Sequence, residues 1–326
     1  MRSASSRVCG EARGAHRGRA VIYHRVALIG LGLIASSMAH AMRRAGAAGE
    51  ISGHARSAET RAVAREIGLC DRVCDSAAEA AEGADLVVLC TPVGVMGAVA
   101  AEIAPALKPG ATLSDVGSVK RSVIRAVAPH VPPGVHFVPA HPLAGTEYSG
   151  PRAGFATLFD NRWCILVPEG ADRAATDRLA AFWRALGANV DEMDADHHDR
   201  VLAVVSHTPH LIAYTMVGVA EHLEIVTESE VIKYSASGFR DFTRIAASDP
   251  VMWRDVFLSN RDATLDILGR FTEELFVLQR AIRMGDGALL HDYFTRTRAI
   301  RRGIIEAGQD TPVPDFGRSA VGQAGE

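Results

Sequence analysis

The sequence has 326 residues, of which 48% are hydrophobic and 22% charged, and its formal net charge is −3. This length allows two domains with separate cores, and the composition is that of a globular protein rather than a disordered chain. The slightly negative charge argues against a nucleic-acid partner, and no apolar run is long enough to predict a membrane span.

The first 24 residues carry five arginines against one acid, Glu11, and lack the apolar stretch of a secretory signal. We expect residues 1–24 to be a disordered or mis-started extension, with an organelle transit peptide as the alternative. The five cysteines are odd in number and scattered, which favours buried free thiols in a reducing, cytoplasmic compartment over disulfides. Only Cys70 and Cys74 form a close pair, and without a second pair we expect no metal site.

From Arg25 onward, short apolar runs alternate with helical patterns, starting with the run Val26–Ile29 and the small-residue helix that follows it. Alternating strands and helices predict a parallel sheet with helices on both faces, and thus a doubly wound Rossmann domain over residues 25–193. The expected strands are 26–29, 51–54, 86–90, 112–115, 136–140, 163–167 and 189–193, and the expected helices include 58–67, 95–107 and 119–128.

Beyond Asp194 the strand patterns stop, and helical patterns over 202–223, 263–283 and 289–307 predict an all-helical domain at 194–310. These helices carry more apolar side chains than one small bundle usually buries, so we expect a homodimer formed through this half. Residues 311–326 are rich in glycine and proline and are expected to be a disordered tail.

A glycine-rich turn follows the first predicted strand, with Gly30, Gly32 and Ala35 in a G-x-G-x-x-A pattern. In this strand-to-helix context the pattern predicts a dinucleotide site, because Gly30 allows the turn and Gly32 lets a pyrophosphate approach the helix N-terminus. A turn that binds nothing is the alternative. The expected cofactor contacts are Gly30, Leu31, Gly32, Leu33 and Ile34, with Thr91 and Pro92 after the strand at 86–90.

Cofactor preference depends on the end of the second strand, where NAD enzymes usually place an acidic residue on the ribose. The segment here is Gly53-His-Ala-Arg-Ser57 and contains no acid. Arg56 could pair with a 2′-phosphate and Ser57 could donate to it, which favours NADP or dual use, although NAD can still bind through its pyrophosphate. The alternative for Arg56 is a solvated loop cation.

Polar residues also follow two later strands, where doubly wound sheets place their active sites. His141 directly follows the predicted strand at 136–140, and a histidine there suits proton transfer from an alcohol as hydride leaves. Ser118 is either an active-site residue or the N-cap of the next helix. Asp115 could orient the same loop.

In the helical half, His207 and His210 can share one helix face, and Pro209 between them removes a backbone donor. A metal at this pair lacks a third ligand. Arg244 lies among aromatic residues and suits capture of a carboxylate, with a salt bridge to Asp241 or Asp249 as the alternative. His197 and His198 are expected to be solvated.

These motifs together resemble the bacterial prephenate dehydrogenase family, which includes arogenate and cyclohexadienyl dehydrogenases. The resemblance is collinear from Val26 to about Glu306. It is carried by the glycine loop, the DVGSVK segment at 115–120, the HPLAGTEYSG segment at 141–150, the VSHTPH segment at 205–210, the GFRDFTRIA segment at 238–246 and the DPxMWR segment at 249–254.

The resemblance implies hydride transfer from a cyclohexadiene carbinol to NAD or NADP with loss of the ring carboxylate as CO2, a step of tyrosine biosynthesis. It implies that His141 accepts the proton of the ring hydroxyl, that Ser118 hydrogen-bonds both this hydroxyl and His141, and that Arg244 holds a substrate carboxylate. It also implies that Thr146, Glu147, His207 and His210 line the pocket, with His210 involved in tyrosine sensing, and that the enzyme is a homodimer.

The sequence departs from the family at Ala35, where glycine is usual, and at Ala55, where NAD-preferring members often carry aspartate. We expect no chorismate mutase module before residue 25 and no regulatory domain after 310. Two alternatives remain open. One is a β-hydroxyacid dehydrogenase, which would need a lysine where this chain has Ser206 to His210, and the other is a non-catalytic NADP-binding sensor.

Overall fold

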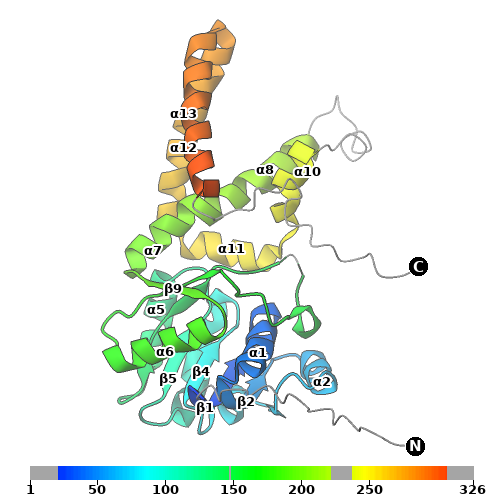
Figure 1. The fold of residues 1–326 in the computed structure, drawn as a ribbon, viewed down its shortest axis with the longest axis vertical. Coiled ribbons are helices and arrows are strands. Elements are labelled where there is room, and N and C mark those ends of the chain that lie inside the picture. The colour runs from blue at the N-terminus through cyan, green and yellow to red at the C-terminus, as the bar shows by residue number, and fades with distance from the viewer. Residues whose placement is uncertain (1–20, 147, 222–236, 307–326) are drawn as a thin grey trace, which may run out of the picture. The chain divides into compact units, whose positions relative to one another are not determined.

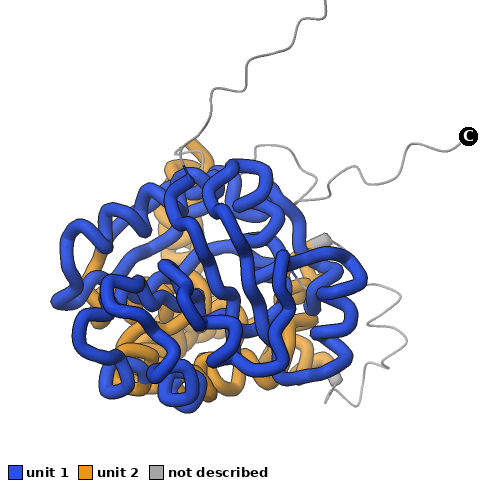
Figure 2. Tube along the Cα trace, turned by 90° about the horizontal axis from the view of Figure 1, so that it is seen from below, with its two compact units in different colours: residues 1–91, 97–116, 127–192 blue, residues 92–96, 117–126, 193–326 orange. Residues whose placement is uncertain are grey.

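In the computed structural model, the described residues are 21–146, 148–221 and 237–306 (Figure 1). Most of the predicted N-terminal extension and the whole predicted tail at 311–326 lie outside these residues. The chain divides into two compact units, coloured separately in Figure 2. The sheet unit comprises residues 1–91, 97–116 and 127–192, and the helical unit comprises residues 92–96, 117–126 and 193–326.

The sheet unit is built on a six-stranded parallel sheet with the order β3-β2-β1-β4-β5-β6. From β1 the chain first adds β2 and β3 on one side of the sheet and then β4, β5 and β6 on the other, which confirms the predicted Rossmann topology. The strands are β1 (Tyr23–Ile29), β2 (Ala48–His54), β3 (Arg72–Val73), β4 (Leu86–Leu89), β5 (Thr112–Asp115) and β6 (His136–Phe137).

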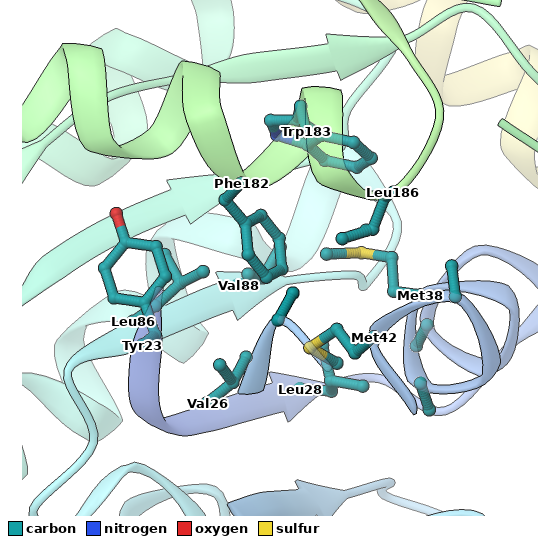
Figure 3. Packing of buried hydrophobic residues seen from close by; sticks show 14 of the residues in the cluster. Tyr23, Val26, Leu28, Met38, Met42, Leu86, Val88, Phe182, Trp183 and Leu186 are labelled. Carbon is teal, nitrogen blue, oxygen red and sulfur yellow. The ribbon is translucent and has the colours of Figure 1, made fainter. Parts of the chain in front are cut away.

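Helices alternate with these strands, as the sequence pattern predicts. The core of the sheet unit lies where α1 and α6 cover the strands, and in Figure 3 Met38 and Met42 of α1 point toward Phe182 of α6 over Val26 and Leu28 of β1. The helices are α1 (Leu33–Ala45), α2 (Ala58–Glu66), α3 (Ala77–Ala81), α4 (Met96–Ile103), α5 (Arg121–Val127) and α6 (Arg173–Ala185).

A second sheet of three strands follows, with the order β7-β8-β9, and its strands are β7 (Ala140–Pro142), β8 (Trp163–Leu166) and β9 (Asn189–Glu192). The single strand predicted at 136–140 is therefore wrong, and the last two predicted strands belong to this sheet. The β5 ladder uses alternate amides, those of His136 and Val138, and the next amide, of Ala140, donates to the Asp115 side chain instead of a backbone carbonyl. The amide of Val138 still donates to Leu113, whereas the Pro139 carbonyl accepts from Val167 in the second sheet.

The described part of the helical unit contains helices of different lengths and no strand. Besides nearly all of α5, its elements are η1 (Val93–Val95), α7 (Ala195–Leu202), η5 (Ala203–His207), α8 (Thr208–Glu221), α10 (Ser237–Thr243), η6 (Arg244–Ala247), α11 (Pro250–Ser259), α12 (Arg261–Met284) and α13 (Gly287–Glu306). The η5 turn is π-helical and ends two residues before Pro209. A widened turn suits this position, because the proline ring cannot donate to the carbonyl four residues earlier and would clash with it.

The run Ala195–Ala220 is the one described helix that is long and apolar enough to cross a membrane, judged by length and composition alone. Core helices of soluble proteins meet the same criterion. The helices α12 and α13 run side by side (Figure 1). They leave large apolar side chains exposed, including Leu265, Leu275, Phe276, Ile282, Phe294 and Ile300.

Candidate active site

The glycine turn of the sheet unit has the form that a pyrophosphate requires. Gly30 has a φ of +104°, and a Cβ at this position would lie 2.7 Å from the carbonyl oxygen of Cys90. At Gly32 a Cβ would have no described atom within 4 Å, so open space lies over the start of α1. No side chain caps this helix, and its first turn contains no acid. The free amides of the α1 N-terminus therefore fit an anionic group.

Two neighbouring features support the cofactor assignment. Ala35 is fully buried, which is consistent with a small residue where α1 packs on the sheet. The hydroxyl oxygen of Thr91, at the end of β4, is buried without a hydrogen-bond partner among the described residues. An orphaned hydroxyl beside the Gly30 turn is a group that a bound dinucleotide can satisfy.

The loop between β2 and α2 is basic. Arg56 is exposed, and Ser57 caps α2 by accepting the Thr60 amide at 3.3 Å. The Ser57 O–H therefore remains available as a donor. Arg61, which was not predicted, donates to the carbonyls of Ala55 at 2.8 Å and Arg56 at 2.9 Å and pairs with Asp75. These bonds fix the backbone that presents Arg56.

His141 lies in β7, where it is buried and aligned with Ile165 of β8. The carboxylate of Asp115, at the end of β5, accepts the amide of Ala140 at 3.2 Å. This bond links the end of the parallel sheet to the residue before His141. Asp115 therefore holds the residue before His141, and its expected role in orienting the Ser118 loop stays a prediction.

In the helical unit, the loop that carries Ser118 is held by Asp199 of α7. The helix α5 begins at Arg121, so Ser118 lies two residues before its N-cap position. The Asp199 carboxylate instead accepts the amides of Lys120 at 2.7 Å and Arg121 at 3.0 Å. The interpretation of Ser118 as a helix cap is therefore wrong, because a residue from another helix supplies the acceptor.

The prediction of a solvated pair at His197 and His198 is half wrong. His197 is exposed, but His198 is fully buried and its Nδ1 lies 2.8 Å from the Asp199 carboxylate. Burial alone would raise the pKa of Asp199. The hydrogen bonds from His198 and from the amides of Lys120 and Arg121 outweigh that effect and hold the pKa below its usual value.

His207 is fully buried beside Asn260, the residue before α12. The Asn260 amide nitrogen lies 3.0 Å from His207 Nδ1 and donates to the Asp199 carbonyl at 2.8 Å. Burial lowers the pKa of His207 to about 4, although the negative charge of Asp199 and the nearby Ser118 backbone act to raise it. The imidazole is therefore neutral near pH 7.

His210 lies one helical turn further along, and its Nδ1 contacts a carbonyl oxygen instead of an amide nitrogen. Its Nδ1 donates to the Ser206 carbonyl at 2.8 Å, and its ring stacks on Trp253 at 3.8 Å between centroids. Burial lowers the pKa of His210, with a further lowering from the nearby charge of Arg244. The structure thus brings His210, Trp253 and Arg244 into one neighbourhood of the helical unit.

Arg244 begins η6 and is exposed. Of the two carboxylates considered as its partners, Asp241 pairs with Arg240 at 3.2 Å and Asp249 caps α11 through the Met252 amide. In the sheet unit, Thr146 is exposed and its hydroxyl accepts the Tyr148 amide. Glu147 lies outside the described residues.

The predicted site residues divide between the two units. The glycine loop, Arg56, Ser57, Thr91, His141 and Thr146 lie in the sheet unit, whereas Pro92, Ser118, His207, His210 and Arg244 lie in the helical unit. The convergence of His141 and Arg244 on one cleft stays a prediction. Sequence reasoning missed Asp199, Asn260 and the fully buried Lys120. Only Lys120 gave a signal, as a cation inside the segment at 115–120.

Two family models match the chain. The prephenate dehydrogenase nucleotide-binding domain matches residues 38–192, and the prephenate dehydrogenase dimerization domain matches residues 194–296. Among curated relatives, the cyclohexadienyl dehydrogenase of Zymomonas mobilis is 42% identical over 87% of this chain and 97% of its own length. The prephenate dehydrogenase of Bacillus subtilis is 33% identical over 86% of this chain and 76% of its own length.

A solved structure agrees with these matches. Prephenate dehydrogenase from Aquifex aeolicus, in complex with hydroxyphenyl propionate and NAD+, superposes with a TM-score of 0.80 and 31% sequence identity, covering 86% of this chain and 98% of its own. The matches extend over both the sheet unit and the helical unit. The chain therefore belongs to the prephenate dehydrogenase family.

Proposed function

We propose that the chain catalyses the oxidative decarboxylation of prephenate, arogenate or both in tyrosine biosynthesis. Prephenate would give 4-hydroxyphenylpyruvate and arogenate would give tyrosine, each with release of CO2 and reduction of NAD(P)+. The observation that carries this proposal is the 42% identity to a cyclohexadienyl dehydrogenase along 97% of that enzyme's length. The glycine turn with open space over the α1 N-terminus supplies the cofactor site that the reaction needs.

Bound NAD(P)+ supplies the hydride acceptor. His141 would accept the proton of the ring hydroxyl, a role that suits an imidazole because its unperturbed pKa lies near neutrality. Ser118 would hydrogen-bond the same hydroxyl, and Arg244 would hold a substrate carboxylate through paired N–H donors. Loss of the ring carboxylate leaves an aromatic ring, which makes the step strongly favourable.

The β2–α2 loop supports NADP use or dual use. Arg56 is exposed and follows β2, where the 2′-phosphate would lie in a Rossmann site, so its guanidinium would pair with that phosphate. The same loop contains no carboxylate between Gly53 and Ser57 to repel that phosphate. The finer preference therefore depends on Arg56 and Ser57.

The exposed apolar side chains of α12 and α13 support a homodimer, as does the match to a dimerization domain. We propose that the dimer acts in the cytoplasm on a small-molecule substrate, with no nucleic-acid or membrane partner. Of the two alternatives, a β-hydroxyacid dehydrogenase would need a lysine at the position where this chain has Ser206 to His210. The sensor alternative does not explain the similarity of both units to enzymes.

The test is an assay of the purified protein with each of the four pairs formed by prephenate or arogenate and NAD+ or NADP+. We expect reduced nicotinamide to appear, measured by absorbance, and the aromatic product to form in equal amount, measured by chromatography. The ratio of kcat/KM values among the four pairs then gives substrate and cofactor preference. Absence of turnover with all four pairs would contradict the proposal.

A further inference from the structure

A chain of buried hydrogen bonds in the helical unit links two segments that carry proposed site residues. Asp199 of α7 holds the amides of Lys120 and Arg121, which follow Ser118. The Asp199 carbonyl accepts from Asn260, and Asn260 contacts His207. Asp199, His207 and Asn260 are each at most 5% exposed, so these bonds form away from water. Buried polar groups of this kind are costly unless paired.

The hydrogen bonds determine which nitrogen of His207 carries its proton. The Asn260 nitrogen that contacts His207 Nδ1 also contacts the Asp199 carbonyl oxygen. A carbonyl can only accept, so that nitrogen belongs to the amide NH2 group and donates to Nδ1. Nδ1 therefore holds a lone pair, and the neutral ring carries its proton on Nε2.

The Nε2–H group is a donor directed away from Asn260. It has no hydrogen-bond partner of standard geometry among the described residues, although the Ser118 backbone is near enough to favour the protonated ring. His210 has the other tautomer, because its Nδ1 donates to Ser206 and leaves a lone pair on Nε2. The two histidines therefore present a donor and an acceptor one helical turn apart.

We propose that Asn260 and Asp199 are positioning residues for the dehydrogenase reaction, with Asn260 fixing His207 as an Nε2–H donor and Asp199 fixing the backbone beside Ser118. The inference rests on the proposed function. A donor at His207 Nε2 can bind the Ser118 carbonyl or an oxygen of the anionic substrate, but it cannot bind another donor. Asn260 would thereby act on catalysis through His207 without touching the substrate.

The main test is Asn260→Asp, which keeps the side-chain shape but replaces the donor by an acceptor. His207 must then place a proton on Nδ1, so the wild-type tautomer is lost. We expect nitrogen NMR of the histidine rings to show the Nε2–H tautomer for His207 in the wild type and its loss in the variant. We also expect kcat/KM for the substrate to fall at least about tenfold, while KM for the cofactor stays within about twofold.

Thr264→Val is the matched control, since Thr264 is also buried on α12, one turn after Asn260. It should change neither the His207 tautomer nor kcat/KM by more than about twofold. Asn260→Ala removes the donor without adding charge, and it should also lower kcat/KM, which keeps the test decisive if the carboxylate prevents folding. Asp199→Asn should accelerate hydrogen exchange at the Lys120 and Arg121 amides.

An Nδ1–H tautomer for His207 in the wild type would overturn the inference. So would a loss of kcat/KM in Asn260→Asp no larger than in Thr264→Val. If the wild-type protein turns over neither prephenate nor arogenate, the proposed function fails. The tautomer and the amide exchange then still decide whether Asn260 and Asp199 position these groups.

Discussion

The sheet unit and the helical unit differ in how many charged side chains they bury. In the sheet unit most buried side chains are apolar, many of them in one cluster that extends from Tyr23 to Ala188, and Asp115 and His141 are its buried ionisable side chains other than cysteines and Tyr23 among the described residues. In the helical unit the buried residues include an ammonium group, two imidazoles and a carboxylate, at Lys120, His198, His207 and Asp199. Apolar burial therefore stabilises both units, and the helical unit depends in addition on more paired charged groups.

The same contrast appears at the surface of the helical unit. Large apolar side chains of α12 and α13 remain exposed while polar side chains are buried. A second copy of the chain can cover those apolar faces, but it cannot replace the internal hydrogen bonds. The comparison leads us to expect that chemistry is most sensitive to the sheet unit, and that pH and association are most sensitive to the helical unit.

The largest expected effect is that of His141→Asn in the sheet unit. Asparagine keeps a polar side chain but cannot take up a proton near neutral pH, so we expect kcat to fall about 1000-fold, with substrate binding changed little. Steady-state kinetics and a direct binding measurement would separate the two. Near-normal kcat in this variant would remove His141 as the proton acceptor.

The second prediction concerns pH and the helical unit. The pKa of His207 is lowered to about 4 from 6.5, so the unfolded chain binds more protons between these two values. Stability should therefore fall as the pH drops below 6.5, by about 2 kcal/mol between pH 7.5 and 5. The groups acting on His207 are Asp199, His198, His210 and the Ser118 backbone.

Urea unfolding at fixed protein concentration would measure this effect, because a dimer's stability depends on concentration. His207→Gln should remove about 2 kcal/mol of the pH dependence, whereas the exposed His197→Gln should leave it unchanged. Equal pH dependence in wild type and His207→Gln would show that burial of His207 does not set the acid sensitivity of the helical unit.

The third prediction tests the exposed apolar face. Phe276 of α12 is 63% exposed in the single chain. Phe276→Glu should weaken the dimer by about 2 kcal/mol or more, because a charge would be buried at the interface. Sedimentation at several concentrations would show the shift toward monomer. Glu274→Gln, a neutralising change on the same helix, is the control, and an unchanged dimer in both variants would place the interface elsewhere.

The fourth prediction concerns substrate binding by the helical unit. Arg244→Gln should raise KM for the substrate about 30-fold, equivalent to about 2 kcal/mol, with a smaller effect on kcat, because it removes a charge-assisted pair with the carboxylate. Arg240→Gln is the matched control, since Arg240 pairs with Asp241. A loss of kcat as large as that of His141→Asn would mean that Arg244 acts in the chemical step.

How much could be predicted from the sequence follows the same division. Local signals were sufficient for the sheet unit, since the Gly30 turn and the alternating strands and helices depend on neighbouring residues. The helix α11 was also visible locally but was overlooked, although its start is marked by Asp249 and Pro250. In contrast, Asn260 lies 53 residues from His207, and Asp199 lies 79 residues from Lys120. No periodicity predicts pairs so distant in the sequence.

The smallest expected effect is that of Arg56→Ala on cofactor choice. Because Arg56 is exposed, its pair with a 2′-phosphate would be partly screened, and we expect KM for NADP to rise about tenfold, equivalent to about 1.4 kcal/mol, with little change for NAD. Arg65→Ala is the control, since Arg65 lies on α2 and pairs with Asp75. Equal weakening of both cofactors would mean that Arg56 supports the loop or the pyrophosphate site. A preference for NADP would then have to come from Ser57, or from the absence of an acidic residue that would repel the 2′-phosphate.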